Sequence, residues 1–318
     1  MQILGIVEFS PALFCSKDAL GQSGSITIAG AEGFLSMPSI PEWSKNEKDP
    51  LRQKLISPPE VKTWKSGDNP IFWGSPVEYP SGRSQVEKAL LKFDLKSKNE
   101  ENTNQKIYKA FPHWFNLFKQ YIQLFTTQYT MGERSIVIDQ YENLTLFESQ
   151  NGKFKRIPNL QHDSLTIEIG GKDTSVHLEH FQEACRLASL LAEPRLEYAL
   201  LLDAYSAQAV GDYRKAIIES ATSLEVGLTS RIVQEFQPRN IDFGEHLLNK
   251  YKTLGGRLEL AQILKIIQPD PDYRSLIVEN RNSVIHKGVV PERKTVKAAL
   301  EKVSALLNDL SPTIYQKP

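Results

Sequence analysis

A change of pattern near residue 178 constrains the fold of this chain more than any other feature of its sequence. Before that point, short strand-like runs are separated by Pro, Gly and Asn. After it, apolar residues recur at helical spacing almost to the end, and prolines and glycines divide them into segments. The sequence therefore predicts an α+β chain, with a β-rich domain over residues 1–178 and an all-α helical bundle over residues 179–318.

Strand signals dominate the predicted first domain. We expect strands in QILGIVEF (2–9) and GSITIAG (24–30), and hairpins that turn at Asn151-Gly152 and Gly170-Gly171. Residues 37–82 are rich in Pro, Ser, Trp and Lys, which predicts long loops. The composition suits a sensor or target-recognition domain, and it suits a scaffold equally well.

A single helix is predicted within this domain, over residues 111–125. Pro112 suits its first turn, where a missing N–H costs no hydrogen bond. The aromatic residues of this segment recur at roughly helical spacing. We expect them to cover a sheet rather than to form a base-stacking surface.

The totals exclude several classes of protein. Lys plus Arg and Asp plus Glu both number 38, so the chain is not uniformly basic, although a local basic patch remains compatible. Two cysteines are too few for a disulfide framework and favour a reducing compartment. No apolar run approaches the ~20 residues of a membrane span, and the N-terminus lacks a basic signal region. We expect a cytoplasmic protein without a membrane partner.

Residues 272–287 form the most informative helix of the predicted bundle. An aspartate at 270 or 272 can cap it. At about 100° per residue, one stripe faces the bundle core, and it contains Tyr273, Leu276, Ile277, Asn280 and Val284. The opposite face contains Ser275, Glu279, Asn282 and His286, with Arg274 and Arg281 on the flank.

Val278 and Ile285 form a second, smaller apolar patch outside the core stripe. A lone amphipathic helix needs only one stripe, so we expect a second copy of the chain to pack there. The alternative is that the two residues widen one broad core face.

The polar residues of this helix have the chemistry of a phosphodiester site. His286 lies in the last turn, because Gly288 is a natural residue to follow a helix. Asn282, one turn earlier, can orient the imidazole, and Arg281 carries a donor fork that suits phosphate. Further cations follow, namely Lys287, Arg293, Lys294 and Lys297. A proton-transfer group, an orienting amide and an anion clamp can together cleave a phosphodiester without a metal or other cofactor.

The stretch RNSVIH, residues 281–286, resembles the R-x4-6-H motif of the HEPN superfamily (higher eukaryotes and prokaryotes nucleotide-binding). IHKG resembles the His-Gly ending often found there, with one lysine inserted, and residues 211–228 resemble the long acid-bearing helix of these bundles. The resemblance covers about residues 195–312 and leaves the N-terminal half unassigned.

The resemblance implies a bundle that dimerises and brings two motif helices together. Many members resemble metal-independent endoribonucleases of toxin–antitoxin and antiviral defence systems, so RNA and an antitoxin or defence-system protein are expected partners. By this resemblance Arg281 would stabilise the phosphorane, His286 would act as general base or acid, and Asn282 would position the phosphate or the imidazole. The family leaves a second function open, a non-catalytic module that binds nucleotide or RNA or docks a protein.

Other signals are weaker. Glu219 or Glu225 in the long helix could complete the site, but a structural role is favoured. His177 and His180 in HLEH lack a third ligand at a diagnostic spacing, so no metal site is predicted.

Overall fold

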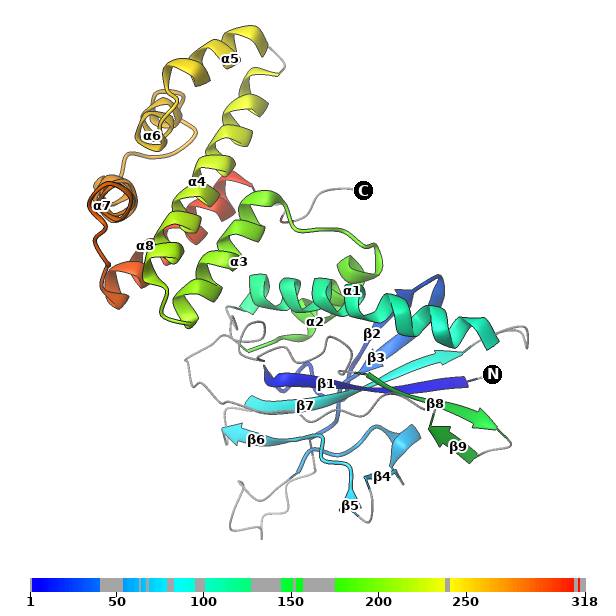
Figure 1. Ribbon diagram of the computed structural model, residues 1–318. Coiled ribbons are helices and arrows are strands. Elements are labelled where there is room, and N and C mark those ends of the chain that lie inside the picture. The colour runs from blue at the N-terminus through cyan, green and yellow to red at the C-terminus, as the bar shows by residue number, and fades with distance from the viewer. Residues whose placement is uncertain are drawn as a thin grey trace. The chain divides into compact units, whose positions relative to one another are not determined.

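The computed structural model describes residues 2–40, 54–62, 64–66, 69–78, 83–94, 101–126, 144–150, 153–156, 175–237, 241–311 and 314. The chain forms two compact units, which divide between Glu193 and Pro194. The first unit combines an antiparallel sheet with helices, and the named elements of the second unit are all helices in its described residues (Figure 1). The predicted α+β class is confirmed.

One seven-stranded antiparallel sheet forms the centre of the first unit. Its strands are β1 (Gln2–Cys15), β2 (Ser23–Ile28), β3 (Ala31–Ser36), β6 (Gly74–Glu78), β7 (Arg83–Asp94), β8 (Leu144–Gln150) and β9 (Lys153–Arg156). They run in the order β2-β3-β7-β1-β8-β9, and β6 also pairs with β7. The register of β1 against β7 shifts between Glu8 and Leu13. Pro11 lies in this irregularity, where its missing N–H interrupts no ladder.

The strand predictions are largely confirmed. β1 covers the first expected strand and β2 covers the second up to Ile28, and β8 pairs with β9 so that Gln150 lies opposite Lys153, as the Asn151-Gly152 hairpin requires. The hairpin at Gly170-Gly171 lies outside the described residues. The predicted loop region 37–82 contains β6, the short pair β4 (Lys65–Ser66) and β5 (Asn69–Pro70), and a 3₁₀ turn (Pro59–Val61). These strands are short, and they carry no alternating pattern that the sequence could have revealed.

Helix α1 (Glu101–Thr126) is longer than predicted. Pro112 lies in its interior rather than in its first turn, so the predicted start of this helix was wrong. Pro112 has no N–H, so the helix lacks one backbone hydrogen bond in the preceding turn. Ile107 and Phe111 are buried beside this turn, and their packing stabilises the continuous helix. The expected aromatic cover is confirmed: the Trp114 and Phe118 rings stack 5.5 Å apart in the core.

Helix α2 (Leu178–Ser189), which was predicted to open the bundle, packs in the first unit instead. The sheet approaches it so closely that a Cβ on Gly24 would lie 2.7 Å from Cys185 Sγ. The Thr27 amide and the Trp114 indole both donate to Ser189 Oγ, at 2.8 Å and 3.3 Å. The boundary between units therefore follows α2 rather than preceding it. α1 and α2 lie on the same face of the sheet (Figure 1).

The second unit is built around helix α4 (Tyr213–Phe236). The other helices are α3 (Leu196–Ala209), α5 (Ile241–Lys250), α6 (Leu254–Ile263), α7 (Asn280–Lys287) and α8 (Arg293–Leu310), with a π-helix over Tyr273–Glu279. α4 lies beside α3 and α8 and is flanked by α5 and α6 toward its C-terminal end (Figure 1). Gly255 and Gly256 lie in the first turn of α6, where Thr253 Oγ1 accepts from the Gly256 amide at 3.1 Å.

The core of this unit closes where α3, α4 and α8 meet. A Cβ on Gly227 of α4 would lie 2.5 Å from Leu307 Cδ2 of α8, so only glycine allows this approach. Ser223 donates to the Glu197 carbonyl oxygen at 2.6 Å, and Tyr198 donates to that of Ser311 at 2.6 Å. Among the helices of the described ranges, none is long and apolar enough to cross a membrane.

Candidate phosphodiester site

The motif RNSVIH lies on α7, directly after the π-helical segment. In this wider turn, the Asn280 side chain donates to the carbonyl oxygens of Ser275 and Leu276, at 3.0 Å and 2.9 Å. These bonds satisfy carbonyls where the helix changes from π to α geometry. Asn280 was predicted on the core face, and the structure gives it this local role.

The start of the π-helix is tied to α8 by Lys302. Its ammonium bonds Asp270, lies 4.0 Å from Asp272, and sits 5.3 Å from the centre of the Tyr273 ring. The Asp270 carboxylate also accepts from the Asp272 amide at 2.9 Å, so the expected capping role belongs to Asp270. The hydrogen bond from Lys302 lowers the pKa of Asp270, and the same bond raises the pKa of Lys302.

The faces of the motif helix follow the predicted wheel in part, because Tyr273, Leu276 and Asn280 of the core stripe are only half-buried. Ile277 and Val284 are buried, and this segment packs against α4. All four residues predicted to face outward are exposed, namely Ser275, Glu279, Asn282 and His286. Within the motif, Asn282 and His286 are therefore presented to solvent, while Val284 anchors the helix.

Arg281 and Asn282 contact each other. Arg281 is half-buried, and its Nη1 lies 3.4 Å from Asn282 Oδ1. Asn282 was expected to orient the imidazole of His286 and instead faces Arg281. Within the described part of the chain, the His286 ring makes no hydrogen bond, so both of its nitrogens remain accessible.

A left-handed glycine ends α7 just after the histidine. Gly288 has φ +65° and ψ +19°, a conformation that L-residues with a side chain rarely adopt. The Gly288 amide donates to the Val284 carbonyl oxygen at 3.2 Å, the bond of an αL cap, and the Val289 amide donates to that of Ser283 at 3.3 Å. Arg214 of α4 donates to the Gly288 carbonyl oxygen. The sequence did not single out Arg214, because its partner is 74 residues away.

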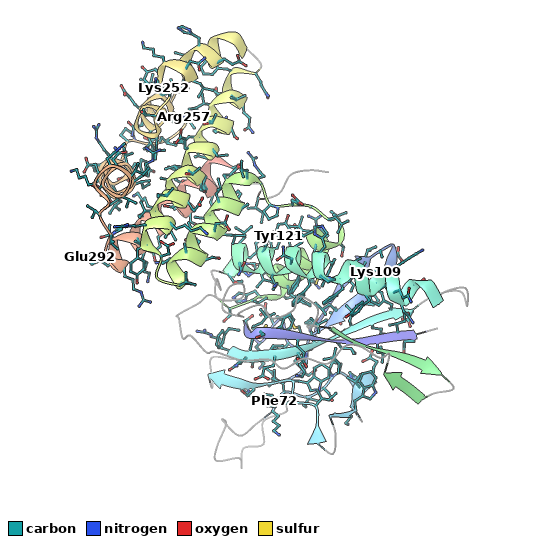
Figure 2. All side chains as sticks on the ribbon, in the orientation of Figure 1. Phe72, Lys109, Tyr121, Lys252, Arg257 and Glu292 are labelled. Atoms are coloured by element: carbon teal, nitrogen blue, oxygen red, sulfur yellow. The ribbon has the colours of Figure 1, made fainter. Side chains whose placement is uncertain are left out.

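The expected phosphate-binding cations are all exposed, but they differ in their neighbours. Lys294 Nζ lies 3.4 Å from Glu292, which precedes α8 (Figure 2), and Lys297 Nζ lies 3.8 Å from Glu301. For Lys287, Arg293 and Arg281, the described residues supply no ion-pair partner. Positive charge near the end of α7 is thus left partly uncompensated.

The two residues of the predicted second apolar patch lie in different surroundings. Ile285 is 45% exposed, whereas Val278 is half-buried, and a Cβ on Gly255 of α6 would lie 3.7 Å from its Cγ1. Two further exposed valines, Val289 and Val290, follow the motif helix. Their position directly after the capping Gly288 is the feature of the sequence that could have predicted this exposed apolar pair.

Neither acid of α4 joins the motif. Glu225 lies 3.7 Å from Arg257 Nε of α6, a half-buried ion pair between two helices of the bundle (Arg257 is labelled in Figure 2). Glu219 makes no ion pair or hydrogen bond to any residue that the structure describes. The favoured structural role therefore suits Glu225.

A second polar cluster lies in the first unit, where β1 meets α2. Ser16 Oγ and Asp18 Oδ1 approach the same ring nitrogen of His177, at 3.1 Å and 3.4 Å. A catalytic relay would need the serine and the aspartate on different nitrogens. Asp18 also accepts from the Leu178 amide at 3.1 Å, which makes it a cap of α2. In the described ranges, no three His, Cys, Asp or Glu residues gather as metal ligands.

The two cysteines are structural. Cys15 and Cys185 are free and fully buried, and burial raises the pKa of both thiols far above the usual range. A buried thiol of raised pKa is a poor nucleophile.

Comparisons with known proteins add no family to this geometry. A scan against protein-family models found no match, and neither did searches of curated proteins and of solved structures. The resemblance to the HEPN superfamily therefore stays a prediction from the sequence motif.

Proposed function

We propose that the protein is a HEPN-type, metal-independent endoribonuclease. The carrying observation is that Arg281, Asn282 and His286 share the solvent-facing end of one anchored helix, beside cations without ion-pair partners in the described residues. Ile277 and Val284 anchor this segment in the bundle, whereas Asn282 and His286 are exposed to solvent.

The proposed reaction needs the RNA, these side chains and a proton donor for the leaving oxygen. His286 removes the proton of a 2′-hydroxyl, and the 2′-oxygen attacks the adjacent phosphorus. The bond from phosphorus to the 5′-oxygen breaks, which leaves a 2′,3′-cyclic phosphate on one fragment and a 5′-hydroxyl on the other. A protonated imidazole, supplied by a second copy or by solvent exchange, delivers the proton to the leaving 5′-oxygen. Arg281 stabilises the phosphorane charge, and Asn282 orients Arg281.

The site is proposed to function as a homodimer. Ile285, Val289 and Val290 give the end of the motif helix exposed apolar surface, and a second copy would cover it while bringing two histidines to one cleft. An antitoxin or another defence protein is the proposed cellular partner, and the first unit is proposed to sense a signal or select the target.

The test incubates purified protein with mixed RNA in EDTA. The variants are Arg281→Ala, His286→Ala and, as a matched control, His246→Ala, which removes an exposed histidine of α5. We expect cleavage to survive the chelator, to persist in the control, and to fall by roughly 10²-fold or more in both motif variants. The products should end in a cyclic phosphate. Cleavage that needs a metal, or that both motif variants retain, would refute the proposal.

A second candidate is a non-catalytic module that binds RNA or nucleotide. The contact of Arg281 with Asn282 favours it, because a donor fork paired with an amide can bind phosphate without chemistry. This candidate predicts that the wild type binds single-stranded RNA without cutting it and that Arg281→Ala weakens binding more than His286→Ala.

A further inference from the structure

Arg214 connects the central helix of the bundle to the end of the motif helix. It lies in the first turn of α4, and its Nη2 donates to the Gly288 carbonyl oxygen. Asp212 caps this turn by accepting from the Lys215 amide at 3.1 Å. The base of the arginine side chain is thus fixed on α4, the helix that packs against α3, α5, α6, α7 and α8.

Gly288 is the residue on which the geometry of this helix end depends. Its amide bonds back to Val284, and its carbonyl points away from the helix and has no partner within it. The guanidinium supplies a donor to this carbonyl and a positive charge at the negative end of the helix dipole. The turn that follows His286 and Lys287 is therefore bonded on both sides, to its own helix and to α4.

We infer that Arg214 is a positioning residue that fixes the orientation of His286 by holding the turn after it. The inference rests on the proposed function, since it gives a catalytic purpose to that orientation. Arg214 acts through the backbone of Gly288, and it need not touch the RNA. A displacement of about 1 Å at a catalytic group can lower the rate as much as 10²-fold, so fraying of this helix end would slow RNA cleavage.

An exposed arginine near the site could also act only by attracting RNA. The two roles differ in kinetics, because loss of a positioning contact lowers kcat, whereas loss of a remote attractive charge raises KM. Lys215 provides a matched control. It is an exposed cation on the next residue of α4, and its side chain makes no bond to the residues around the motif that the structure describes.

The experiment compares full-length wild type with Arg214→Ala, Arg214→Lys and Lys215→Ala. Hydrogen exchange is measured at the amides of Gly288 and Val289, and RNA cleavage is measured as kcat and KM separately. We expect Arg214→Ala to speed exchange at these amides and to lower kcat by roughly tenfold or more with KM almost unchanged. Arg214→Lys should restore part of both, and Lys215→Ala should change neither.

Three results would overturn the inference. The first is equal amide exchange in Arg214→Ala and Lys215→Ala. The second is faster amide exchange in Arg214→Ala with an unchanged kcat, and the third is a change in Arg214→Ala that affects KM alone. If the wild type does not cleave RNA, the proposed function fails by itself. The exchange comparison then still decides whether Arg214 holds the turn after His286.

Discussion

His180, at the start of α2, lies in an environment that opposes protonation of its ring. Its ring stacks on Phe125 with centroids 5.7 Å apart, and its Nδ1 is buried without a hydrogen-bond partner in the described part of the chain. Burial lowers the pKa of His180, and nearby His177 lowers it further, while Glu179 and Asp18 act in the opposite direction. The folded protein therefore prefers the neutral ring.

This preference predicts a loss of stability in mild acid. A histidine whose folded pKa is lowered contributes stability above its unfolded pKa of about 6.5, and that contribution is lost as the pH falls through the folded value. We expect His180→Phe, which keeps an aromatic ring against Phe125, to flatten the decline in unfolding free energy below that pH. Urea titrations monitored by tryptophan fluorescence over a pH series measure this, because all four tryptophans lie in the first unit.

The control for His180 is His113→Phe, which replaces an exposed histidine of α1. It should leave the pH dependence unchanged. Asp18 does not obscure the comparison. Burial acts to raise the pKa of Asp18, but hydrogen bonds from Ser16 and the Leu178 amide lower it overall. Its contribution is therefore lost only in stronger acid. An unchanged decline in His180→Phe would assign the acid sensitivity to other groups.

At the scale of elements, the approach of α4 to α8 depends on the missing side chain of Gly227. A Cβ there would lie 2.5 Å from Leu307 Cδ2, well inside normal contact. We expect Gly227→Ala to destabilise the bundle by about 1–3 kcal/mol, because Leu307 must shift within a packed core. Chemical denaturation followed by circular dichroism measures the change in unfolding free energy.

Gly255→Ala is the matched control for Gly227→Ala, since both glycines lie inside helices of the same unit. At Gly255 the new methyl would meet only Val278 Cγ1, at an ordinary 3.7 Å. We expect this variant to be neutral or stabilising by up to about 1 kcal/mol, the helix preference of alanine over glycine. If both variants changed the unfolding free energy equally, helix propensity rather than packing against Leu307 would determine the effect of Gly227→Ala.

The same elements show what the sequence can and cannot predict. Helical periodicity located most of the bundle and the exposed face of the motif, because burial on one side imposes that spacing. The π-helix over Tyr273–Glu279 could not be predicted, since its wider turn depends on hydrogen bonds from the Asn280 side chain. α2 was assigned to the bundle because its periodicity does not reveal which surface its apolar face covers. That choice depends on Gly24 and Ser189, whose contacts are tertiary.

For the whole molecule, the first question is whether two copies associate through the motif end of the bundle. Ile285 is 45% exposed on α7, and Ile263 is 60% exposed on α6. If the proposed dimer forms through α7, Ile285→Glu should dissociate it, because an unpaired carboxylate would be buried. Ile263→Glu introduces the same charge at a similarly exposed isoleucine and should leave the dimer intact. Sedimentation velocity measures both, and a monomeric wild type would contradict the dimer.

The charge of the whole chain sets the second question. With 38 basic and 38 acidic residues, the molecule has no general attraction for RNA, so binding must depend on a local group of cations. Each phosphate contact to a single strand contributes about 0.7 to the slope of log affinity against log salt. A cation without an acidic partner should contribute more than one already paired within the protein.

Lys287 and Lys294 allow this to be tested within one site. Lys287 has no ion-pair partner in the described residues, whereas Lys294 lies 3.4 Å from Glu292. Fluorescence anisotropy with single-stranded RNA between 50 and 200 mM salt, in the His286→Ala background to prevent cleavage, gives the slope. Lys287→Ala should flatten it by about 0.7, Lys294→Ala by less, and Lys17→Ala in the first unit not at all. If all three variants keep the wild-type slope, the RNA does not bind at the end of α7. RNA bound there would release counterions when its phosphates contact these lysines, and removing a lysine would then lower the slope.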